Sequence, residues 1–181
     1  MYSSEITVTA FFPLYKYCYV LHDQDGDVWM FQERLDNGLY PRYTLAGKTL
    51  SRGLRHTASL CGSFKCDFHN NRISVFIEDI ITTKQDKHLG TWMLNRLIDF
   101  LRQAGKTIQF EEVFGDFKPR DKEQAQAFFS RFGFSRRLLP SGRERIFCPV
   151  EELHLMATKN LKELDFQEIV QEWYAAKFDT A

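Results

Sequence analysis

A single glycine at the start of a strongly amphipathic segment is the first feature of this sequence that suggests chemistry. Gly90 lies in residues 82–94, "TTKQDKHLGTWML", whose first six polar residues form neither a good strand nor a good helix start. The first N–H groups of a helix have no intrahelical partner, and a glycine lets a ligand approach them closely. With Lys84, Lys87 and His88 nearby, such a turn is suited to a phosphate or pyrophosphate. The alternative is that Gly90 only permits tight packing of the helix on a sheet.

Two pairs of adjacent carboxylates are candidates for a general base. Glu78 and Asp79 lie in the apolar run "ISVFIEDII", and Glu111 and Glu112 lie in the next run, "KTIQFEEVF". Neighbouring side chains of a strand point to opposite faces, so only one member of each pair is expected to face a given cleft. Burial there raises the pKa of a carboxyl group toward values useful for proton transfer. Among these candidates we rank Asp79 first and Glu78 second, and for each single acid the alternative stays open that it pairs with Arg or Lys or faces solvent.

Four residues of the types that zinc prefers lie close together in the sequence, namely His56, Cys61, Cys66 and His69. Compact zinc sites usually pair ligands two to four residues apart in both halves, and this spacing does not fit that pattern. We therefore expect no metal. In a reducing compartment the cysteines are expected to be buried thiols rather than disulfides.

Composition narrows the class of protein. The 181 residues fit one domain, and 44% hydrophobic residues with 17 phenylalanines exclude a disordered chain. Lys+Arg and Asp+Glu balance at 24 each, so net charge predicts no clear nucleic-acid surface. No apolar run approaches the ~18 residues of a membrane span, and the start, "MYSSEITV", lacks the features of a signal peptide. We expect a cytoplasmic protein without a membrane partner.

The elements that position these residues begin with strands. Residues 15–34 predict a hairpin around the Asp-Gly turn of "DQDGD", whereas residues 35–54 show no sustained period and are predicted to be irregular. Residues 56–68 and 72–81 predict an antiparallel pair, and the apolar second strand is expected to be central in the sheet.

The clearest element is a helix over residues 89–104. Its apolar residues occupy one half of a helical projection, and Gly105 is expected to stop it at the C′ position. "KTIQFEEVF" follows as a strand, and a strand, helix, strand order of this length implies a parallel crossover.

Two further helices are predicted from capping boxes. Asp121 and Gln124 begin one, which ends at Gly133 and places Ala125, Phe128, Phe129 and Phe132 on one face. A hairpin around "PSGR" follows. Asp165 and Glu168 begin the other helix, whose apolar stripe consists of Phe166, Ile169, Val170, Trp173 and Tyr174.

Together these elements predict an α/β (α+β) fold with a mixed, mostly antiparallel central sheet that contains one parallel pair and is flanked by helices. Residues 1–150 form this domain. Residues 151–181 form a C-terminal helical extension that packs on the domain or on a partner, and a homodimer is one such arrangement.

The order of these elements and two motifs resemble the GNAT superfamily of N-acetyltransferases over about residues 60 to 150. The acyl-CoA loop of that family reads Q/R-x-x-G-x-G/A after a central strand, and "QDKHLG" matches it with Gln85, His88 and Gly90 at the three defined positions. The later family motif, roughly N-x-x-A-x-x-F-Y-x-x-x-G-F, is similar to "KEQAQAFFSRFGF", with Ala125, Phe128, Gly133 and Phe134 in place.

The resemblance implies a GNAT-like sheet with a splayed parallel pair and acetyl-CoA as co-substrate. It assigns contacts with the pantetheine arm to the strand residues Ile80, Ile81 and Thr82. It assigns contacts with the pyrophosphate to Gln85, Lys87, His88, Leu89, Gly90 and Thr91. It also places Phe129 beside the cofactor, where many members have a tyrosine that donates a proton to the leaving thiolate. A thiolate can leave at neutral pH without such an acid, or Tyr or Cys elsewhere can serve.

The function that the resemblance implies is transfer of an acetyl group from acetyl-CoA to a primary amine by direct attack on the thioester. The acceptor stays open between a small molecule, a protein and an aminoacyl-tRNA. One alternative is a degenerate member of the family that binds or regulates without turnover. A second is a Nudix hydrolase, because "YVLHDQDGDVWMFQER" is faintly similar to its first strands, but residues 39–60 lack the carboxylate cluster that holds metal there.

Overall fold

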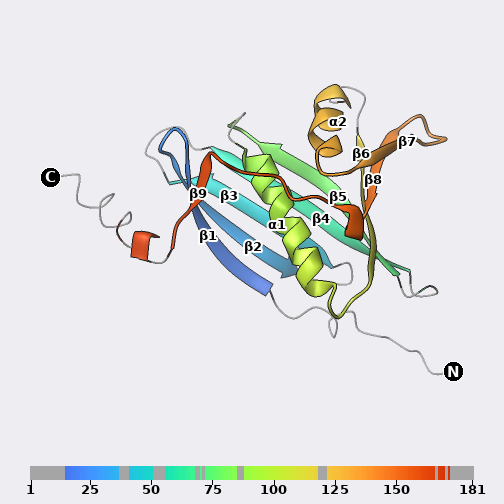
Figure 1. Ribbon diagram of the computed structural model, residues 1–181, viewed down its shortest axis with the longest axis horizontal. Coiled ribbons are helices and arrows are strands. Elements are labelled where there is room, and N and C mark those ends of the chain that lie inside the picture. The colour runs from blue at the N-terminus through green and yellow to red at the C-terminus, as the bar shows by residue number, and fades with distance from the viewer. Residues whose placement is uncertain are drawn as a thin grey trace.

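The computed structural model describes residues 15–36, 41–50, 56–67, 70, 72–84, 88–117, 122–165, 167–169 and 171. The elements in chain order are β1 (Tyr15–Asp23), β2 (Val28–Asp36), β3 (Arg42–Thr49), β4 (Thr57–Asp67), β5 (Arg72–Thr82), α1 (Leu89–Ala104), β6 (Phe110–Phe117), α2 (Lys122–Ser130), β7 (Ser135–Leu138), β8 (Glu144–Pro149), the 3-10 helix η3 (Val150–Glu152) and β9 (Leu161–Glu163). Helix α1 lies across one face of the sheet, and α2 lies near β6, β7 and β8 (Figure 1).

One nine-stranded sheet, in the order β7-β8-β6-β5-β4-β3-β2-β1-β9, organises the described chain. Neighbouring strands are antiparallel except β5 and β6, which run parallel and are joined through α1. The predicted fold class, a mostly antiparallel sheet with one parallel pair flanked by helices, is therefore confirmed. The crossover through α1 places the start of this helix beside the end of β5.

The first hairpin is confirmed, and its alternation shows which face of the sheet is buried. Along β2 the side chains of Trp29, Phe31, Glu33 and Leu35 are buried, while the residues between them are exposed. The turn between β1 and β2 contains Gly26 with a φ of 81°, a left-handed conformation that favours glycine.

The prediction that residues 35–54 are irregular is wrong, because β3 lies within them and pairs with both β2 and β4. Tyr43 and Leu45 are buried and begin an alternating pattern, but Gly47 interrupts it. A Cβ at Gly47 would lie 2.4 Å from the ring of Phe31, so the glycine leaves room for that ring. Because Gly47 stands where the alternation would place a hydrophobic side chain, the sequence pattern did not indicate β3. The glycine is needed because the ring of Phe31 on β2 packs there.

Helix α1 spans the predicted residues and packs aromatic side chains against the sheet. The ring of Trp92 lies 4.8 Å from that of Phe31 and 5.6 Å from that of Tyr19. Gly105 ends the helix as its C-cap with a right-handed φ of −61°, so the expected C′ role is wrong. Its N–H bonds the carbonyl oxygen of Leu101 at 2.8 Å, which continues the helical pattern by one residue.

A buried polar network ties α1 to the sheet. The fully buried carboxylate of Glu33 accepts hydrogen bonds from the hydroxyls of Tyr19, at 2.6 Å, and Tyr43. Arg96 of α1 donates to Glu33 at 3.4 Å and to the Tyr19 hydroxyl, and its guanidinium lies 4.4 Å from the centre of the Tyr19 ring. Because a buried charge is costly unless paired and hydrogen-bonded, these groups fix the position of α1 on the sheet.

The tail contains a strand that the sequence did not reveal. Strand β9 pairs with β1, so residues 161–163 extend the edge of the sheet. The capping box that follows is present, since Asp165 N donates to Glu168 Oε2 at 3.0 Å and Glu168 N donates to Asp165 Oδ1 at 2.8 Å. The residues Asp121, Phe166, Val170, Trp173 and Tyr174, on which the predicted helices also rest, lie outside the described residues.

Among the described segments, no helix combines the length and the apolar composition that crossing a bilayer requires.

The close approach of Phe31 to β3 predicts a large cost for a side chain at Gly47. Gly47→Ala is expected to lower the free energy of unfolding by about 1–3 kcal/mol, because the added methyl overlaps a fully buried ring. Chemical denaturation measures this. Ala46→Val, at the exposed neighbouring position, is the control and is expected to stay within about 0.5 kcal/mol of the wild type. Equal effects of the two substitutions would contradict the packing described.

Candidate anion-binding site between parted strands

The two parallel strands pair only over their first halves. Residues 73–76 of β5 pair with residues 110–114 of β6, and no pairing between these strands is present beyond Phe76 and Phe114. Strand β6 continues beside β8 to Phe117, while β5 continues beside β4 to Thr82. Within the described chain, the edge of β5 from residue 78 to residue 82 that faces away from β4 therefore has no strand partner.

A bulge marks the point of separation. Asp79 pairs with Cys61 and Ile77 pairs with Gly62, which leaves Glu78 as an extra residue in β5. Such a bulge bends its strand and increases the local twist. Strand β6 is still close at this level, because a Cβ at Gly115 would lie 3.3 Å from the carbonyl oxygen of Ile77. Beyond Gly115 the two strands follow different neighbours.

The residues assigned to the pantetheine arm line this unpaired edge. On the other side of the strand Ile80, Ile81 and Thr82 pair with residues of β4. A free strand edge offers backbone N–H and C=O groups to an extended chain, which is how peptides are often bound by a sheet. The arrangement is suited to an extended ligand that contains amide groups.

The start of α1 presents backbone rather than side chains to this opening. His88 is the N-cap, and it makes no side-chain capping hydrogen bond. By helix geometry the N–H groups of Leu89, Gly90 and Thr91 have no intrahelical acceptor. As whole residues, Leu89 and Thr91 are only 1% and 4% exposed, and the first turn contains no acidic residue. These amides form the positive end of the helix dipole, where an anion is stabilised.

His88 has a strained backbone. Its φ of 56° and ψ of 11° are left-handed, and no other non-glycine residue in the described ranges has a positive φ. Glycine adopts this conformation without steric cost, whereas a residue with a Cβ pays roughly 1–2 kcal/mol. The first glycine of the pattern Q/R-x-x-G-x-G/A would adopt this conformation easily. In this chain His88 occupies that position and adopts the same left-handed conformation.

Tight packing does not explain Gly90. A Cβ there would lie 3.6 Å from the ring of Phe128 and 3.9 Å from Cγ2 of Ile80, which are ordinary van der Waals distances. Alanine would fit and is the better helix former by roughly 1 kcal/mol. The other interpretation, that the glycine gives a ligand access to the helix amides, stays a prediction.

Phe128, rather than Phe129, contacts the start of α1. Phe129 is buried, and its ring packs edge-on against Phe128 at 4.9 Å and against Phe134 at 5.2 Å. The sequence placed Phe129 beside the cofactor from its position in the motif. In the structure its ring is part of the core, and Phe128 borders the site.

Lys84 is not a free donor for an anion, contrary to the sequence prediction. Its Nζ lies 2.7 Å from Asp23, 3.0 Å from Asp25 and 2.5 Å from Asp27. Burial opposes its charge, but these three carboxylates raise its pKa well above the ordinary value. The sequence could not reveal this contact, because the acids lie in the turn between β1 and β2. Gln85 and Lys87 lie outside the described residues.

The bulge turns both carboxylates of β5 to the same face, so the prediction of opposite faces is wrong. Asp79 lies directly across from Cys61, and Glu78 forms an ion pair with Arg42 of β3. Burial and the charges of Glu78 and Asp79, against the opposing charge of Arg42, raise the pKa of the Cys61 thiol. Cys61 alternates with the buried Leu60 and Gly62, and Arg42 is exposed beside the buried Tyr43, so their partners Asp79 and Glu78 lie on the face of the sheet away from α1.

The second carboxylate pair lies away from the opening, in contrast to the expected position. Glu111 and Glu112 lie between Phe110 and Val113, within the half of β6 that pairs with β5, and Glu111 forms an ion pair with Arg72 at 2.6 Å. Asp116, which the sequence did not single out, lies on the parted half of β6. It binds Arg145 through two hydrogen bonds of 2.6 and 3.0 Å, and this guanidinium holds the pKa of Asp116 below its usual value.

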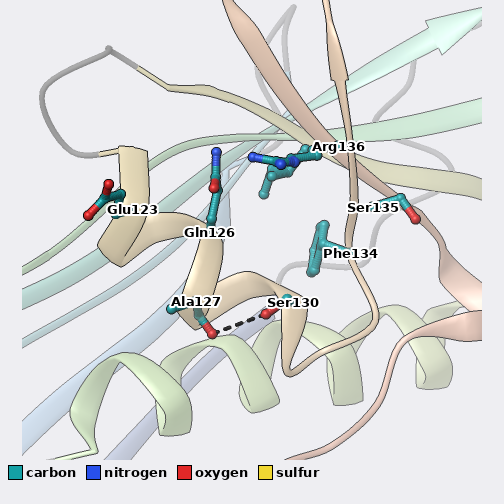
Figure 2. Close-up of a pocket in the computed structure, with 8 residues that line it drawn as sticks. Glu123, Gln126, Ala127, Ser130, Phe134, Ser135 and Arg136 are labelled. Atoms are coloured by element: carbon teal, nitrogen blue, oxygen red, sulfur yellow. Dashed lines mark hydrogen bonds between the residues drawn. The ribbon is translucent and has the colours of Figure 1, made fainter.

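A groove of about 440 Å³ lies beside α2, on the side of this helix that faces away from Phe128 (Figure 2). Its lining consists of Glu123, Gln126, Ala127, Ser130, Phe134, Ser135, Arg136 and Ile146. At 100° per residue, the four lining residues of α2 point away from Phe128, which faces Gly90. The groove therefore lies mainly on the side of α2 away from Phe128, although its Ile146 lies 3.7 Å from a Cβ placed at Gly115.

The cysteines are free thiols in different environments. Cys18 is exposed, Cys61 and Cys66 are partly buried, and burial raises the pKa of Cys148 to about 11. The expectation of buried thiols thus holds for Cys148 alone. In the part of the chain that the structure describes, no three His, Cys, Asp or Glu side chains are grouped to hold a metal ion, and His69 lies outside that part.

Comparison with known proteins gives matches only among solved structures. No family model and no curated protein matches the sequence. One similar chain is from the KacTA–DNA complex, with 20% identity over 61% of this chain and 69% of that chain and a TM-score of 0.45. Another is from AtaTR bound with acetyl-CoA, with 19% identity over 62% and 68% of the two chains and a TM-score of 0.44.

A third similar chain is a putative acetyltransferase of the GNAT family from Desulfovibrio desulfuricans. Its identity is 16% over 60% of this chain and 69% of that chain, and its TM-score is 0.44. Overlap at this level assigns no activity to this chain. What the site can bind follows from its own geometry, namely an unpaired strand edge that leads to the N-terminus of a helix.

The strain at His88 predicts an unusual order of stabilities. His88→Gly is expected to be more stable than His88→Ala by roughly 0.5–1 kcal/mol, because both lose the imidazole but only glycine adopts the left-handed conformation freely. Urea denaturation followed by tryptophan fluorescence measures the difference. If the alanine variant were equally stable, the backbone at this position would not be strained.

Proposed function

We propose that this protein is a GNAT-type N-acyltransferase that transfers the acetyl group of acetyl-CoA to a primary amine. The observation that carries the proposal is the alignment of two features at the end of β5. The strand has an unpaired edge over residues 78–82, and the chain then enters α1 through a left-handed residue. The first feature suits the amide-containing pantetheine arm, and the second suits the pyrophosphate.

The residues that would hold the cofactor act through their backbones. Ile80, Ile81 and Thr82 would bind the arm along the strand edge, and the amides of Leu89, Gly90 and Thr91 would bind the phosphates. His88 would contribute a left-handed turn, and the flanking Gln85 and Lys87 complete the proposed loop. Because amides carry the binding, a histidine in place of a glycine is compatible with it if the conformation is kept, as it is here.

The reaction requires a deprotonated amine that attacks the thioester carbonyl, followed by departure of the CoA thiolate. Asp79 is the proposed general base, since it follows the bulge and lies at the parted strands. Glu78 is second because it is paired with Arg42. Glu111 and Glu112 are disfavoured by their distance along β6 from the opening. Phe129 has no proton to give, so the thiolate leaves without an acid or takes a proton from a Tyr or Cys elsewhere.

The second candidate function is a binding or regulatory module without turnover. The burial of Phe129 favours it, because the position that supplies the usual acid is part of the hydrophobic core. Residues 151–181 are proposed to belong to the same unit as an extension, since β9 pairs with β1. A stabilisation by CoA together with no acetyl transfer to a broad panel of amines would support the module over the enzyme.

Acetyl-CoA is expected to stabilise the protein by about 2.7 kcal/mol at 100 times its Kd, which a thermal-shift titration measures.

Gly90→Asp is expected to weaken the binding of acetyl-CoA at least about tenfold relative to Gly90→Asn, because a carboxylate replaces an amide of equal size beside the phosphates. An acidic residue in the first turn favours the helix, so the aspartate variant should remain folded. Equal affinities of the two variants would place the phosphates elsewhere.

The choice of base is tested by neutral replacements of equal size. Asp79→Asn is expected to lower kcat/KM about 10²–10⁴-fold while leaving the Kd for acetyl-CoA unchanged, because proton removal is lost and the backbone is kept. Glu78→Gln is the matched control, and a loss below about tenfold is expected. Steady-state kinetics and calorimetric titration provide both quantities. A larger loss in the glutamine variant would assign the base to Glu78.

A further inference from the structure

Lys84 connects two segments that lie far apart in the sequence. It follows β5 by two residues and directly precedes residues 85–87, which lead into α1. Its Nζ lies within 3.0 Å of carboxylate oxygens of Asp23, Asp25 and Asp27, which form the turn between β1 and β2. Only 12% of the lysine side chain is exposed, so its ammonium group interacts with these carboxylates rather than mainly with solvent.

The acidic turn is well fixed on its own side. The Asp23 side chain is 0% exposed. It accepts hydrogen bonds from Trp29 Nε1 at 3.1 Å and from the backbone N–H groups of Asp25 at 2.9 Å and Asp27 at 3.1 Å. Burial alone would raise the pKa of Asp23, but the bonds from Lys84, Trp29 and the backbone lower it, so the carboxylate stays charged.

The residue before Lys84 is fixed as well. Thr83 N donates to the carbonyl oxygen of Thr57 at 2.9 Å, and Thr57 N donates to Thr83 Oγ1 at 2.7 Å. On the other side of residues 85–87, the carbonyl oxygen of His88 accepts the first helical hydrogen bond, from Trp92 N at 2.9 Å. Lys84 and His88 are four residues apart, which span at most about 14 Å, so the position of Lys84 limits the position of His88.

We propose that Lys84 is a positioning residue that holds the start of α1 in its anion-binding geometry by binding the acidic turn between β1 and β2. The consequence for acetyl-CoA affinity rests on the function proposed above. A loop fixed before binding loses less conformational freedom when the ligand arrives. Loss of the lysine removes the three ion pairs that join this segment to the turn between β1 and β2.

The test compares Lys84→Met, which removes the charge, with Lys84→Arg, which keeps it. Native-state hydrogen exchange is measured without ligand at the amides of Thr83 and Trp92. The Kd for acetyl-CoA and kcat are measured in parallel. In Lys84→Met, exchange at both amides is expected to rise and the Kd to rise about tenfold, with kcat at saturation within about twofold of the wild type. Lys84→Arg is expected to restore the exchange rates and the Kd.

Asn95→Ala is the control for a general loss of stability, because Asn95 of α1 makes two hydrogen bonds with the backbone of Met156, away from the acidic turn. It is expected to lower the thermal midpoint without changing the Kd. If Lys84→Met does not fold, Asp27→Asn removes one of the three partners and is expected to change the same quantities in the same direction.

Unchanged exchange at Trp92 in Lys84→Met overturns the proposal whatever the affinity for acetyl-CoA. Faster exchange with an unchanged Kd overturns the link between Lys84 and cofactor binding. If the wild-type protein has no affinity for acetyl-CoA but exchange changes as expected, the proposed function fails, while the positioning of α1 by Lys84 is supported. The two failures are therefore distinguishable.

Discussion

The separation of β5 from β6 is the constraint on which the candidate site depends. A continuous pairing would satisfy the backbone of β5 and leave no edge for a ligand. The bulge at Glu78 bends β5, and β6 stays with β8, so the two strands part where the crossover through α1 brings a helix N-terminus. The change in pairing thus creates the unpaired edge at the place where the crossover brings the free amides of the helix start. The same bulge also places Glu78 and Asp79 on one face, which unmodified alternation would have prevented.

The helix that supplies the amides must be held firmly, and the structure holds it at two levels. Along its length, Trp92 packs on the aromatic core, and Arg96 reaches the buried carboxylate of Glu33. At its start, His88 has a left-handed φ, a strained conformation that persists only where the surrounding structure holds it. A buried ionic network is expensive to assemble and costly to break, which makes it suited to fixing one arrangement rather than to adding stability. The stabilising contacts therefore lie in the core, and the strain lies at the site.

The regular elements could be predicted because their signals are local. The periodicity of α1, the Asp-Gly turn and the capping box of Asp165 and Glu168 each act within a few residues. Strand β3 was missed because Gly47 breaks its hydrophobic alternation, and the reason for this glycine is the ring of Phe31 on another strand. The bulge at Glu78 and the partners of Lys84 were missed for the same reason, since each depends on residues that are distant in sequence. The glycine and the turn at the site could be predicted from the sequence. The orientation of its carboxylates could not, because it depends on the register between strands.

The departures from the family pattern affect binding and catalysis differently. Where binding uses backbone amides, a substitution is tolerated if the backbone keeps its conformation, and His88 keeps the left-handed conformation. Where catalysis uses a side chain, a substitution removes the group itself, and Phe129 offers no proton at the position of the tyrosine. Loss of a leaving-group acid is tolerable for a thiolate, whereas loss of the base is not, because a protonated amine has no lone pair to attack with. Whether this chain is an enzyme or a binding module therefore depends on the carboxylates at the bulge more than on Phe129.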